Sequence, residues 1–383
     1  MANNASLRKA DKVENDEFYT QYDYIQKEIN AYLEYNPDVF KGKTVLLPCD
    51  DPEWSNFTRF FAQNFENFGL KKLISTSYAI ESKSIKEGYQ LTIFEMESPQ
   101  FDEDKTKTHG KIFTLTRDSN KSGVIDIDDL EWTYLEGDGD FRSDEVKALR
   151  DEADIIITNP PFSLFREFLA WIMEADKEFV IIGNMNAITY KEVFPLLMNN
   201  KVWLGNGFNA GNAYFRPASA NTSEYANGVY DDKTGLVKFR NCCWFTNLDH
   251  DRRHQPLSLM TMDDNIKFSK HKEIKNSGYN RYDNYDAIEV PFTDGIPSDY
   301  NGIMGVPISF LPKYCPEQFE ILGMCENLDL YGLKTRVYTT QECQERYFEI
   351  FGKKGTYDLN ASGVVNGYKV YQRILIRKKV SDK

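Results

Sequence analysis

The sequence predicts an α/β fold built around a doubly wound, mainly parallel sheet, and two observations support that prediction. Short apolar runs recur at residues 43–48, 71–77, 154–158 and 179–183, as expected of strands that are buried on both faces. Apolar residues at helical spacing follow several of these runs, and strands that alternate with helices indicate a parallel sheet. Such sheets bind ligands at the carboxyl ends of their strands.

The first strand–helix–strand unit begins with residues 43–48 (KTVLLP) and ends with residues 71–77 (KKLISTS), both of which we expect to be strands. Aromatic residues between them recur at helical spacing, and Gly69 marks the expected end of the helix. These residues are Trp54, Phe57, Phe61, Phe65 and Phe68. The unit therefore has the composition of a βαβ motif.

A charged insertion follows the second strand. Residues 89–94 and 111–116 alternate apolar and polar side chains around this charged stretch, which predicts a surface β-hairpin. We expect the core to resume at residues 132–138 (WTYLEGD).

The alternation then continues with residues 154–158 (DIIIT), which lead into a helix from about Ser163. Residues 179–183 (FVIIG) lead into a second helix, and the capping-box spacing of Thr189 and Glu192 indicates where it starts.

The pattern changes after about residue 206. Residues 201–205 (KVWLG) form the last expected strand of the alternation, and turns rich in Gly and Asn follow. Residues 242–247 (CCWFTN) predict one more strand, after which the sequence is irregular and rich in Tyr, Asn and basic residues. We therefore expect a second functional region on the C-terminal side.

Composition indicates a folded, aromatic-rich protein, because 41% of the 383 residues are hydrophobic and 14% are aromatic. Residues 1–18 lack the apolar core of a signal peptide, and no apolar run reaches the length that spans a bilayer. We expect a soluble, cytoplasmic protein without a membrane partner. The 6 cysteines show no CxxC pair or disulfide spacing, so reduced thiols are expected.

No metal site is predicted. The chain has 4 histidines, and of these His250 and His254 are spaced i,i+4. The intervening Asp-Arg-Arg indicates a solvated turn rather than a ligand pair.

The net charge of −13 argues against a polyanionic partner for the surface as a whole, but basic residues are concentrated locally. Residues 267–281 hold five basic residues and one Glu, and residues 368–383 are basic again. These segments either contact phosphates or form an ordinary solvated surface. The candidate phosphate-binding residues are Lys267, Lys270, Lys272, Lys275 and Arg281.

The motif NPPF interrupts the strand at residues 154–158. Pro160 and Pro161 supply no N–H, and a following proline holds Asn159 in an extended conformation. The Asn159 side-chain oxygen and the Pro160 carbonyl are then two neutral acceptors at the carboxyl end of a strand. A plain strand-ending turn is the alternative to a functional site.

Two such acceptors suit the exocyclic amine of a nucleobase. They could take its two N–H groups and leave the nitrogen lone pair available, and no strong base is needed. Phe162 could stack on the base ring, an interaction worth about 1–3 kcal/mol. The base must leave a duplex to reach the pocket, so base flipping is implied.

Four motifs together resemble one family. IITNPPF, with the upstream DEFYT (16–20), CDDP (49–52) and GDGDF (137–141), is similar to S-adenosylmethionine-dependent adenine-N6 DNA methyltransferases of the EcoRI type. The resemblance extends over most of the chain in several blocks in the same order. It is weaker in residues 80–130, 206–240 and 250–280, and after about residue 325.

The resemblance implies roles for individual residues. It gives the catalytic role to Asn159, Pro160, Pro161 and Phe162. It places the methionine end of the cofactor against Phe18, Tyr19 and Thr20, and its amino-acid moiety against Pro48, Cys49 and Asp50. The strand loop Pro48-Cys49-Asp50 lacks the usual Gly-x-Gly. Glu81 is the candidate for the cofactor ribose.

The GDGDF motif is expected to bind the cofactor adenine. Asp140 would accept from the exocyclic amine and Phe141 would flank the ring, with Asp138 as the substitute carboxylate. A calcium loop or a plain turn is the alternative; the EF-hand pattern of a calcium loop continues differently and needs a terminal Glu.

The resemblance further implies a Rossmann-like class I methyltransferase sheet with an appended C-terminal target-recognition region. We expect an N-terminal segment over residues 1–40, a catalytic domain over 41–250 and a DNA-binding region over 251–383. The implied partner is double-stranded DNA with a short palindromic site such as GAATTC, modified by a monomer. A companion restriction endonuclease fits this function without direct contact.

Two other functions share parts of this pattern. Methyltransferases of RNA adenines and of protein glutamines also use NPPF-like motifs, and the long basic C-terminal region favours DNA over these substrates. A DNA-binding module with an inactive methyltransferase fold would need a broken acceptor site, whereas Asn159, Pro160 and Phe162 are all present.

Overall fold

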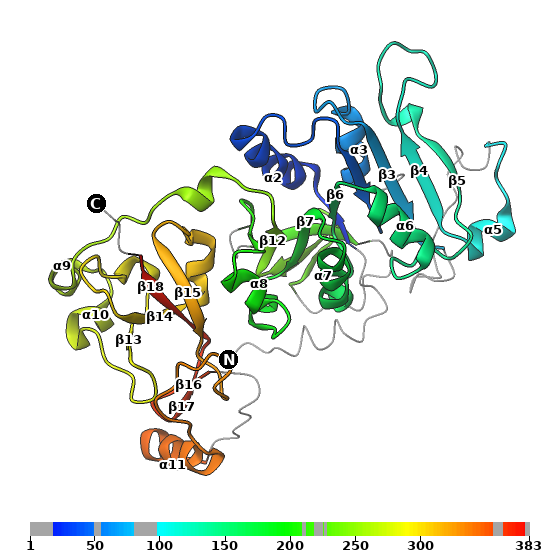
Figure 1. Ribbon diagram of the computed structural model, residues 1–383. Helices are drawn as coiled ribbons and strands as arrows, with labels where there is room; N and C mark the ends of the chain where they lie inside the picture. The colour runs from blue at the N-terminus through cyan, green and yellow to red at the C-terminus, as the bar shows by residue number, and fades with distance from the viewer. Residues whose placement is uncertain are drawn as a thin grey trace. The chain divides into compact units, whose positions relative to one another are not determined.

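The computed structural model describes residues 18–49, 55–79, 98–208, 212–217, 225, 228–354 and 363–379. The chain divides into two compact units (Figure 1). Unit 1 comprises Met1–Val193 and Val202–Asp251, and unit 2 comprises Phe194–Lys201 and Arg252–Lys383. Residues 18–40, which were expected in a separate N-terminal segment, are part of unit 1.

Unit 1 contains an eight-stranded sheet in the order β5-β4-β3-β2-β6-β7-β12-β8. Its strands are β2 (Thr44–Leu47), β3 (Lys72–Ser77), β4 (Lys111–Leu115), β5 (Glu131–Tyr134), β6 (Ile155–Thr158), β7 (Glu178–Asn184), β8 (Trp203–Leu204) and β12 (Cys242–Thr246). The four central strands β3, β2, β6 and β7 are parallel. The flanking strands pair antiparallel, so the sheet is mixed rather than fully parallel.

Two segments differ from the sequence prediction. Residues 111–115 were expected in a surface hairpin, but β4 pairs with β3 and extends the main sheet. Residues 89–94, the other half of that expected hairpin, lie outside the described residues. The short β8 lies at the sheet edge, because β12 pairs antiparallel with β7 and occupies the position beside it.

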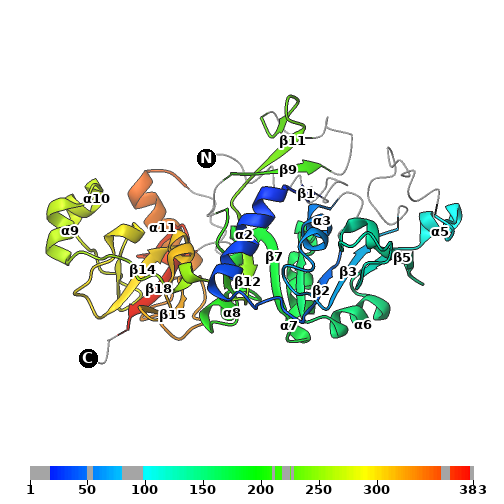
Figure 2. The ribbon, with the colours of Figure 1, turned by 90° about the horizontal axis from the view of Figure 1, so that it is seen from above.

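Helices lie on both faces of the main sheet (Figure 2). They are α2 (Tyr22–Tyr35), α3 (Asn56–Gln63), α6 (Asp144–Glu152) and α7 (Phe165–Glu174), and α5 (Glu103–Thr108) precedes β4. Successive residues of a strand point to opposite faces of the sheet. On one face, Val45, Ile155 and Val180 pack in a core cluster with Phe57 of α3 and Ile29 of α2. The central strands are therefore buried on both sides, which explains their continuous apolar sequence.

Two helix predictions need correction. The aromatic helix after β2 is short: α3 ends at Gln63, and residues 64–69 form turns that end at Gly69 with φ +62°. The predicted capping box is wrong, because the Thr189 hydroxyl donates to the Asn186 carbonyl (2.9 Å) inside a 3₁₀ turn. The next helix, α8 (Phe194–Met198), starts later, with Pro195 in its first turn.

A second, four-stranded sheet of unit 1 has the order β1-β9-β11-β10 and is entirely antiparallel. Its strands are β1 (Phe18–Thr20), β9 (Asn212–Pro217), β10 (Tyr230–Asp231) and β11 (Leu236–Arg240). Figure 2 shows β1, β9 and β11 side by side. One face of this sheet packs on the unit 1 core through Ala213 and Phe215, which are fully buried.

The buried carboxylate of Glu28 holds the loop that leads toward β9. It accepts the Tyr32 hydroxyl (2.6 Å), the Asn206 N–H (2.9 Å) and the Gly207 N–H. A Cβ at Gly205 would lie 2.0 Å from this carboxylate, so the turn requires a glycine there.

Unit 2 is built on a sheet in the order β13-β14-β18-β15 and a hairpin of β16 and β17. The strands are β13 (Ala287–Glu289), β14 (Ile303–Pro307), β15 (Phe319–Met324), β16 (Gly363–Val365), β17 (Tyr368–Val370) and β18 (Arg373–Lys378). Its helices are α8, α9 (Met262–Phe268), α10 (Lys272–Ser277) and α11 (Thr340–Phe351).

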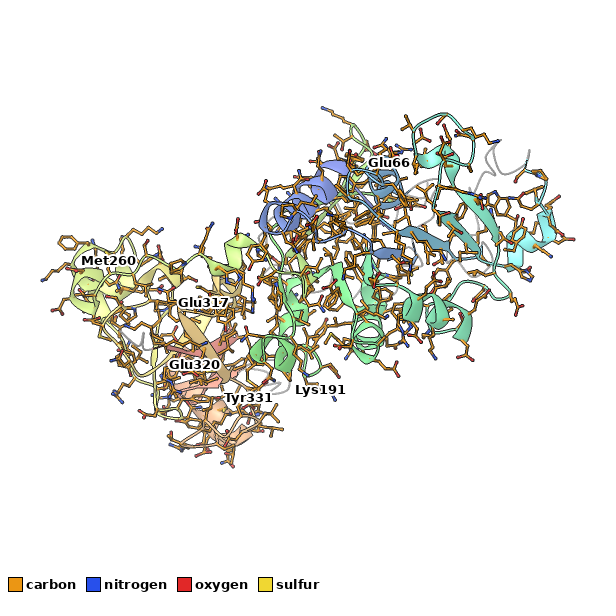
Figure 3. All side chains as sticks on the ribbon, turned by 45° about the horizontal axis from the view of Figure 1, so that its top comes forward. Glu66, Lys191, Met260, Glu317, Glu320 and Tyr331 are labelled. Atoms are coloured by element: carbon orange, nitrogen blue, oxygen red, sulfur yellow. The ribbon has the colours of Figure 1, made fainter. Side chains whose placement is uncertain are left out.

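Ion pairs connect the strands of unit 2. Glu320 of β15, labelled in Figure 3, pairs with Arg377 of β18 at 2.6 Å. Arg373 pairs with Glu289 at 2.9 Å. Two basic residues of the C-terminal segment, Arg373 and Arg377, therefore form ion pairs between strands of the sheet. None of the described helices in either unit is long and apolar enough to cross a membrane.

Replacing Glu28 with Gln should destabilise unit 1. The glutamine NH₂ cannot accept a hydrogen bond, so at least one of the three donors loses its partner, at a cost of about 1–3 kcal/mol. We expect a lower urea midpoint and faster amide exchange at residues 205–208. Glu34→Gln, on the exposed face of the same helix, is the control and should change neither. Unchanged exchange in Glu28→Gln would show that the carboxylate does not hold the loop.

Candidate active site

Several candidate site residues lie where the parallel strands of the main sheet end. Cys49 follows β2, Tyr78 follows β3 and Asn159 follows β6, so all three lie at the carboxyl edge of the sheet. The buried Thr158 hydroxyl donates to the Pro48 carbonyl at 2.6 Å and ties the end of β6 to the end of β2. Asp50 and Glu81, also expected here, lie outside the described residues.

Asn159 connects the NPPF motif to the N-terminal strand. Its side-chain N–H donates to the Phe18 carbonyl of β1 at 2.8 Å. Since that carbonyl only accepts, the hydrogen bond sets the orientation of the amide. The Asn159 Oδ1 is buried and has no hydrogen-bond partner among the residues that the structure describes. An unsatisfied buried acceptor costs about 1–3 kcal/mol, which a ligand N–H group would recover.

Three aromatic rings pack against one another beside the NPPF motif. Phe162 lies in the 3₁₀ turn Phe162–Leu164 that leads into α7, and it is half-buried. Its ring lies 6.2 Å from the Phe18 ring, nearly parallel, and 5.5 Å from the Phe239 ring, edge to face. Phe18 and Phe239 are 4.6 Å apart. Pro160 is buried and Pro161 is half-buried at the same strand end.

Phe239 was not predicted as a site residue. It lies on β11, in a part of the chain where the resemblance was weak, and only the pairing of β11 with β9 and of β9 with β1 brings it to Phe162. Tyr78 was also missed. A signal for it existed, because Tyr78 directly follows a predicted parallel strand, as Asn159 does.

The loop after β2 makes a sharp turn at Cys49, which has a φ of +66°. A non-glycine residue in this left-handed region is strained by roughly 1–2 kcal/mol. The chain therefore turns at Cys49 in a conformation that favours glycine, although the Gly-x-Gly of the usual motif is absent. Thr20, the last residue of β1, is buried with an unpartnered hydroxyl, and its carbonyl accepts from Asn56 at 2.7 Å.

The GDGDF loop packs against the end of β3. Gly139 has a φ of +90°, and a Cβ there would lie 2.4 Å from the Ser77 carbonyl. The Ala79 N–H donates to the Asp138 carbonyl (2.7 Å), and the Phe141 N–H donates to the Tyr78 hydroxyl (3.4 Å). Burial, with Cys49 and Asp140 nearby, raises the pKa of the Tyr78 hydroxyl, which remains a proton donor at neutral pH.

Asp140 and Phe141 are both engaged within the protein. The Asp140 carboxylate accepts hydrogen bonds from the Arg142 guanidinium, the shortest at 2.6 Å, and these bonds lower the pKa of the carboxyl. Asp138 accepts the Asp140 N–H at 3.1 Å. Phe141 is 1% exposed and packs edge to face on Phe168, so its ring offers no open face to a ligand. That Phe141 flanks the cofactor adenine stays a prediction, and in this structure the ring is buried in the protein.

The five predicted phosphate-binding residues are all exposed in unit 2. Lys267 lies on α9, and Lys272 and Lys275 lie on α10, which packs against it. Lys270 pairs with Asp294 at 2.9 Å and Arg281 pairs with Asp286 at 3.2 Å, so two of the five charges are partly neutralised.

The histidine pair makes no metal site. His250 is buried and its Nε2 lies 3.1 Å from the Leu204 carbonyl, whereas the His254 Nδ1 lies 2.9 Å from Glu317. Among the residues that the structure describes, no group of His, Cys, Asp or Glu could hold a metal ion.

Comparison with known proteins identifies the relatives of this chain. Residues 6–379 match the family model of the adenine-specific methyltransferase EcoRI. The Type II methyltransferase M.EcoRI of Escherichia coli is 42% identical over 330 residues, which are 86% of this chain and 91% of the relative. No solved structure matches the chain.

Two relatives from mycoplasmas are more distant. The Type II methyltransferase M.MpnI of Mycoplasma pneumoniae is 34% identical over 87% of this chain and 90% of its own length. The Type II methyltransferase M.MgeORF184P of Mycoplasma genitalium is 32% identical over 97% of this chain and 98% of its own length. The family match and these identities confirm the resemblance drawn from the motifs: the chain belongs to the EcoRI family of adenine-specific methyltransferases.

Proposed function

We infer that this protein transfers a methyl group from S-adenosylmethionine to the N6 amine of an adenine flipped out of duplex DNA. The target would lie in a short palindrome such as GAATTC. The family membership supports the reaction, and one structural observation supports the catalytic site: the buried, unpartnered Oδ1 of Asn159 at the carboxyl edge of the sheet.

Asn159 would act as an acceptor and not as a base. An adenine amine donating to Oδ1 and to the Pro160 carbonyl keeps its lone pair available for the bond to the methyl carbon, and one N–H proton is released afterwards. Because the Asn159 N–H is already committed to the Phe18 carbonyl, the oxygen is held in place before the base arrives. Such preorganisation lowers the barrier without strong basicity.

Phe162 would stack on the flipped base. Its ring is half-buried, and Phe18 and Phe239 support it from two directions. Pro161, whose carbonyl accepts the Leu164 N–H at 3.0 Å, starts the turn that presents this ring.

The residues at the ends of β2 and β3 fit the cofactor. S-adenosylmethionine supplies, when bound, a methyl group on a positively charged sulfur. The turn at Cys49, with Pro48 before it and Asp50 after it in the sequence, would hold the amino-acid moiety, and Phe18, Tyr19 and Thr20 would enclose the methionine end. Asp140, or Asp138 in its place, would accept from the adenine amine, and Phe141 would flank the ring, with Tyr78 as a second aromatic residue nearby.

The proposed domain roles follow from this site. The main sheet of unit 1 would be a Rossmann-like class I methyltransferase sheet, with the reaction at its carboxyl edge. Unit 2 would be the target-recognition region, with Lys267, Lys272 and Lys275 among its phosphate contacts. A monomer suffices, because one strand is modified per visit, and a companion restriction endonuclease need not touch it.

Asn159→Ala should lower the rate of methyl transfer at least about 100-fold, the usual cost of removing one preorganised hydrogen-bonding group. Cofactor affinity should stay within a few-fold, because the replaced oxygen faces the amine. The measurement is labelled-methyl transfer to duplex DNA, RNA and protein, with cofactor binding by calorimetry. Asn199→Ala, an exposed position, is the control. Turnover near wild type in Asn159→Ala would refute the acceptor role, and labelling of RNA or protein alone would refute the substrate.

Phe162→Ala should weaken capture of the flipped base by about 1–3 kcal/mol, the worth of one stacked base. A duplex with 2-aminopurine at the target position reports this as a smaller fluorescence rise on binding. Phe162→Trp should retain the signal. Phe165→Leu, at the first residue of α7, is the control for an effect that arises only from altered packing of that helix. An equal loss of cofactor binding in Phe162→Ala would count against stacking.

Cys49→Gly should retain cofactor binding and gain up to about 1 kcal/mol in stability, because glycine adopts the +66° φ without strain. Cys49→Val should weaken cofactor binding and lower stability, since a β-branched residue resists that conformation. Thermal unfolding and cofactor titration of the two variants test this. Equal behaviour of Gly and Val at this position would show that the turn does not matter.

A further inference from the structure

The small sheet of unit 1 has two chemically different faces. Residues that stand opposite one another on antiparallel strands point to the same face. The pairs Tyr19 with Arg216, Tyr214 with Lys238, and Asn212 with Arg240 therefore share one face, which we call the outer face. The other face carries Phe18, Phe215, Val237 and Phe239 and packs on the core.

The outer face is exposed and basic. Asn212, Arg216 and Arg240 are exposed, Tyr214 is 37% exposed and Lys238 is half-buried. Among the described residues, Arg216, Lys238 and Arg240 form no ion pair. In a protein with a net charge of −13, three cations without a carboxylate partner on one face of two neighbouring strands point to an anionic ligand.

One carboxylate lies at the edge of this face. The register pairs Asp231 of β10 with Leu236, on the far side of β11 from Arg216. The Asp231 carboxylate is occupied by the turn that joins β10 to β11, where it accepts from the Lys233 N–H (3.0 Å) and the Thr234 hydroxyl (3.1 Å).

Neighbouring residues of β1 and β11 connect this face to the proposed adenine acceptor. In β1, the Phe18 ring packs against Phe162, and the Phe18 carbonyl accepts a hydrogen bond from Asn159. The next residue, Tyr19, points to the outer face beside Arg216. In β11, Phe239 contacts Phe162 and its two neighbours, Lys238 and Arg240, turn outward. A base that rotates out of a duplex stays attached to its own phosphates, which must remain at the rim of the pocket.

We propose that the outer face of this sheet binds the DNA backbone next to the target adenine, with Arg216, Lys238 and Arg240 contacting phosphates. These residues belong to unit 1, whereas the basic residues of α9 and α10 belong to unit 2. The proposal rests on the proposed function, since it names a DNA contact of the same site. The two guanidinium groups suit phosphate oxygens, and Tyr214 between the cations adds a further donor.

The test is the salt dependence of DNA binding by the variant R216Q/K238Q/R240Q. Each lost phosphate contact lowers the slope of log affinity against log salt by about 0.9, so the slope should fall by roughly two to three. Affinity at ~0.1 M salt should fall about 10- to 100-fold on a duplex with GAATTC and on one without it. Fluorescence anisotropy gives both values.

The matched control is K41Q/K71Q/K177Q, which also removes three positive charges. These lysines precede β2, β3 and β7, at the amino edge of the main sheet. The slope of this control should stay close to wild type. R216K/R240K keeps the charge and should keep the slope, which separates a phosphate contact from a folding defect. Circular dichroism and cofactor binding of the glutamine variant should match wild type.

Neutral methylphosphonate linkages locate the contact. Placed beside the target adenine, they should weaken wild-type binding and add no further loss in the glutamine variant. An unchanged salt slope in the glutamine variant, with active wild-type enzyme, would overturn this proposal and leave the proposed function intact. A wild type that methylates no DNA would instead overturn the proposed function, and if that protein also binds no duplex, the inference falls with it.

Discussion

The hydrogen bond from Asn159 to the Phe18 carbonyl is the interaction on which the proposed site depends. It joins the end of β6 in the main sheet to β1 in the small sheet, and so connects the two sheets of unit 1. By committing the amide N–H, it leaves Oδ1 as a buried acceptor. The same contact brings the Phe18 ring to Phe162, so acceptor and stacking surface are positioned together.

The rest of unit 1 supports this contact from two sides. On one side, the parallel strands align Cys49, Tyr78 and Asn159 at one edge, because the carboxyl ends of parallel strands coincide. On the other side, β9 holds β1, and Glu28 holds the loop that leads toward β9. Buried charge is costly unless it is fully hydrogen-bonded, and Glu28 meets that condition with main-chain and Tyr32 donors.

The small sheet then acquires a double role under our proposals. Its inner face supports the pocket for the base, and its outer face would hold the phosphates of the same nucleotide. Alternation of side chains along β1 and β11 allows one strand to serve both purposes. Base contact and backbone contact would thus be coupled through single strands, without any separate hinge.

The sequence by itself predicted the strands β2, β3, β6, β7 and β12, since short apolar runs between polar or turn-forming residues are typical of buried strands. Its motifs also indicated the family, and the prolines of NPPF predicted an acceptor at Asn159 because their effect on the backbone is local. Tertiary structure alone decided that β4 and β12 pair antiparallel in the main sheet and that Phe141 is a core residue. It also brought Phe239 to Phe162 and placed three cations on one outer face. These facts depend on pairing between residues far apart in the chain, which local pattern does not encode.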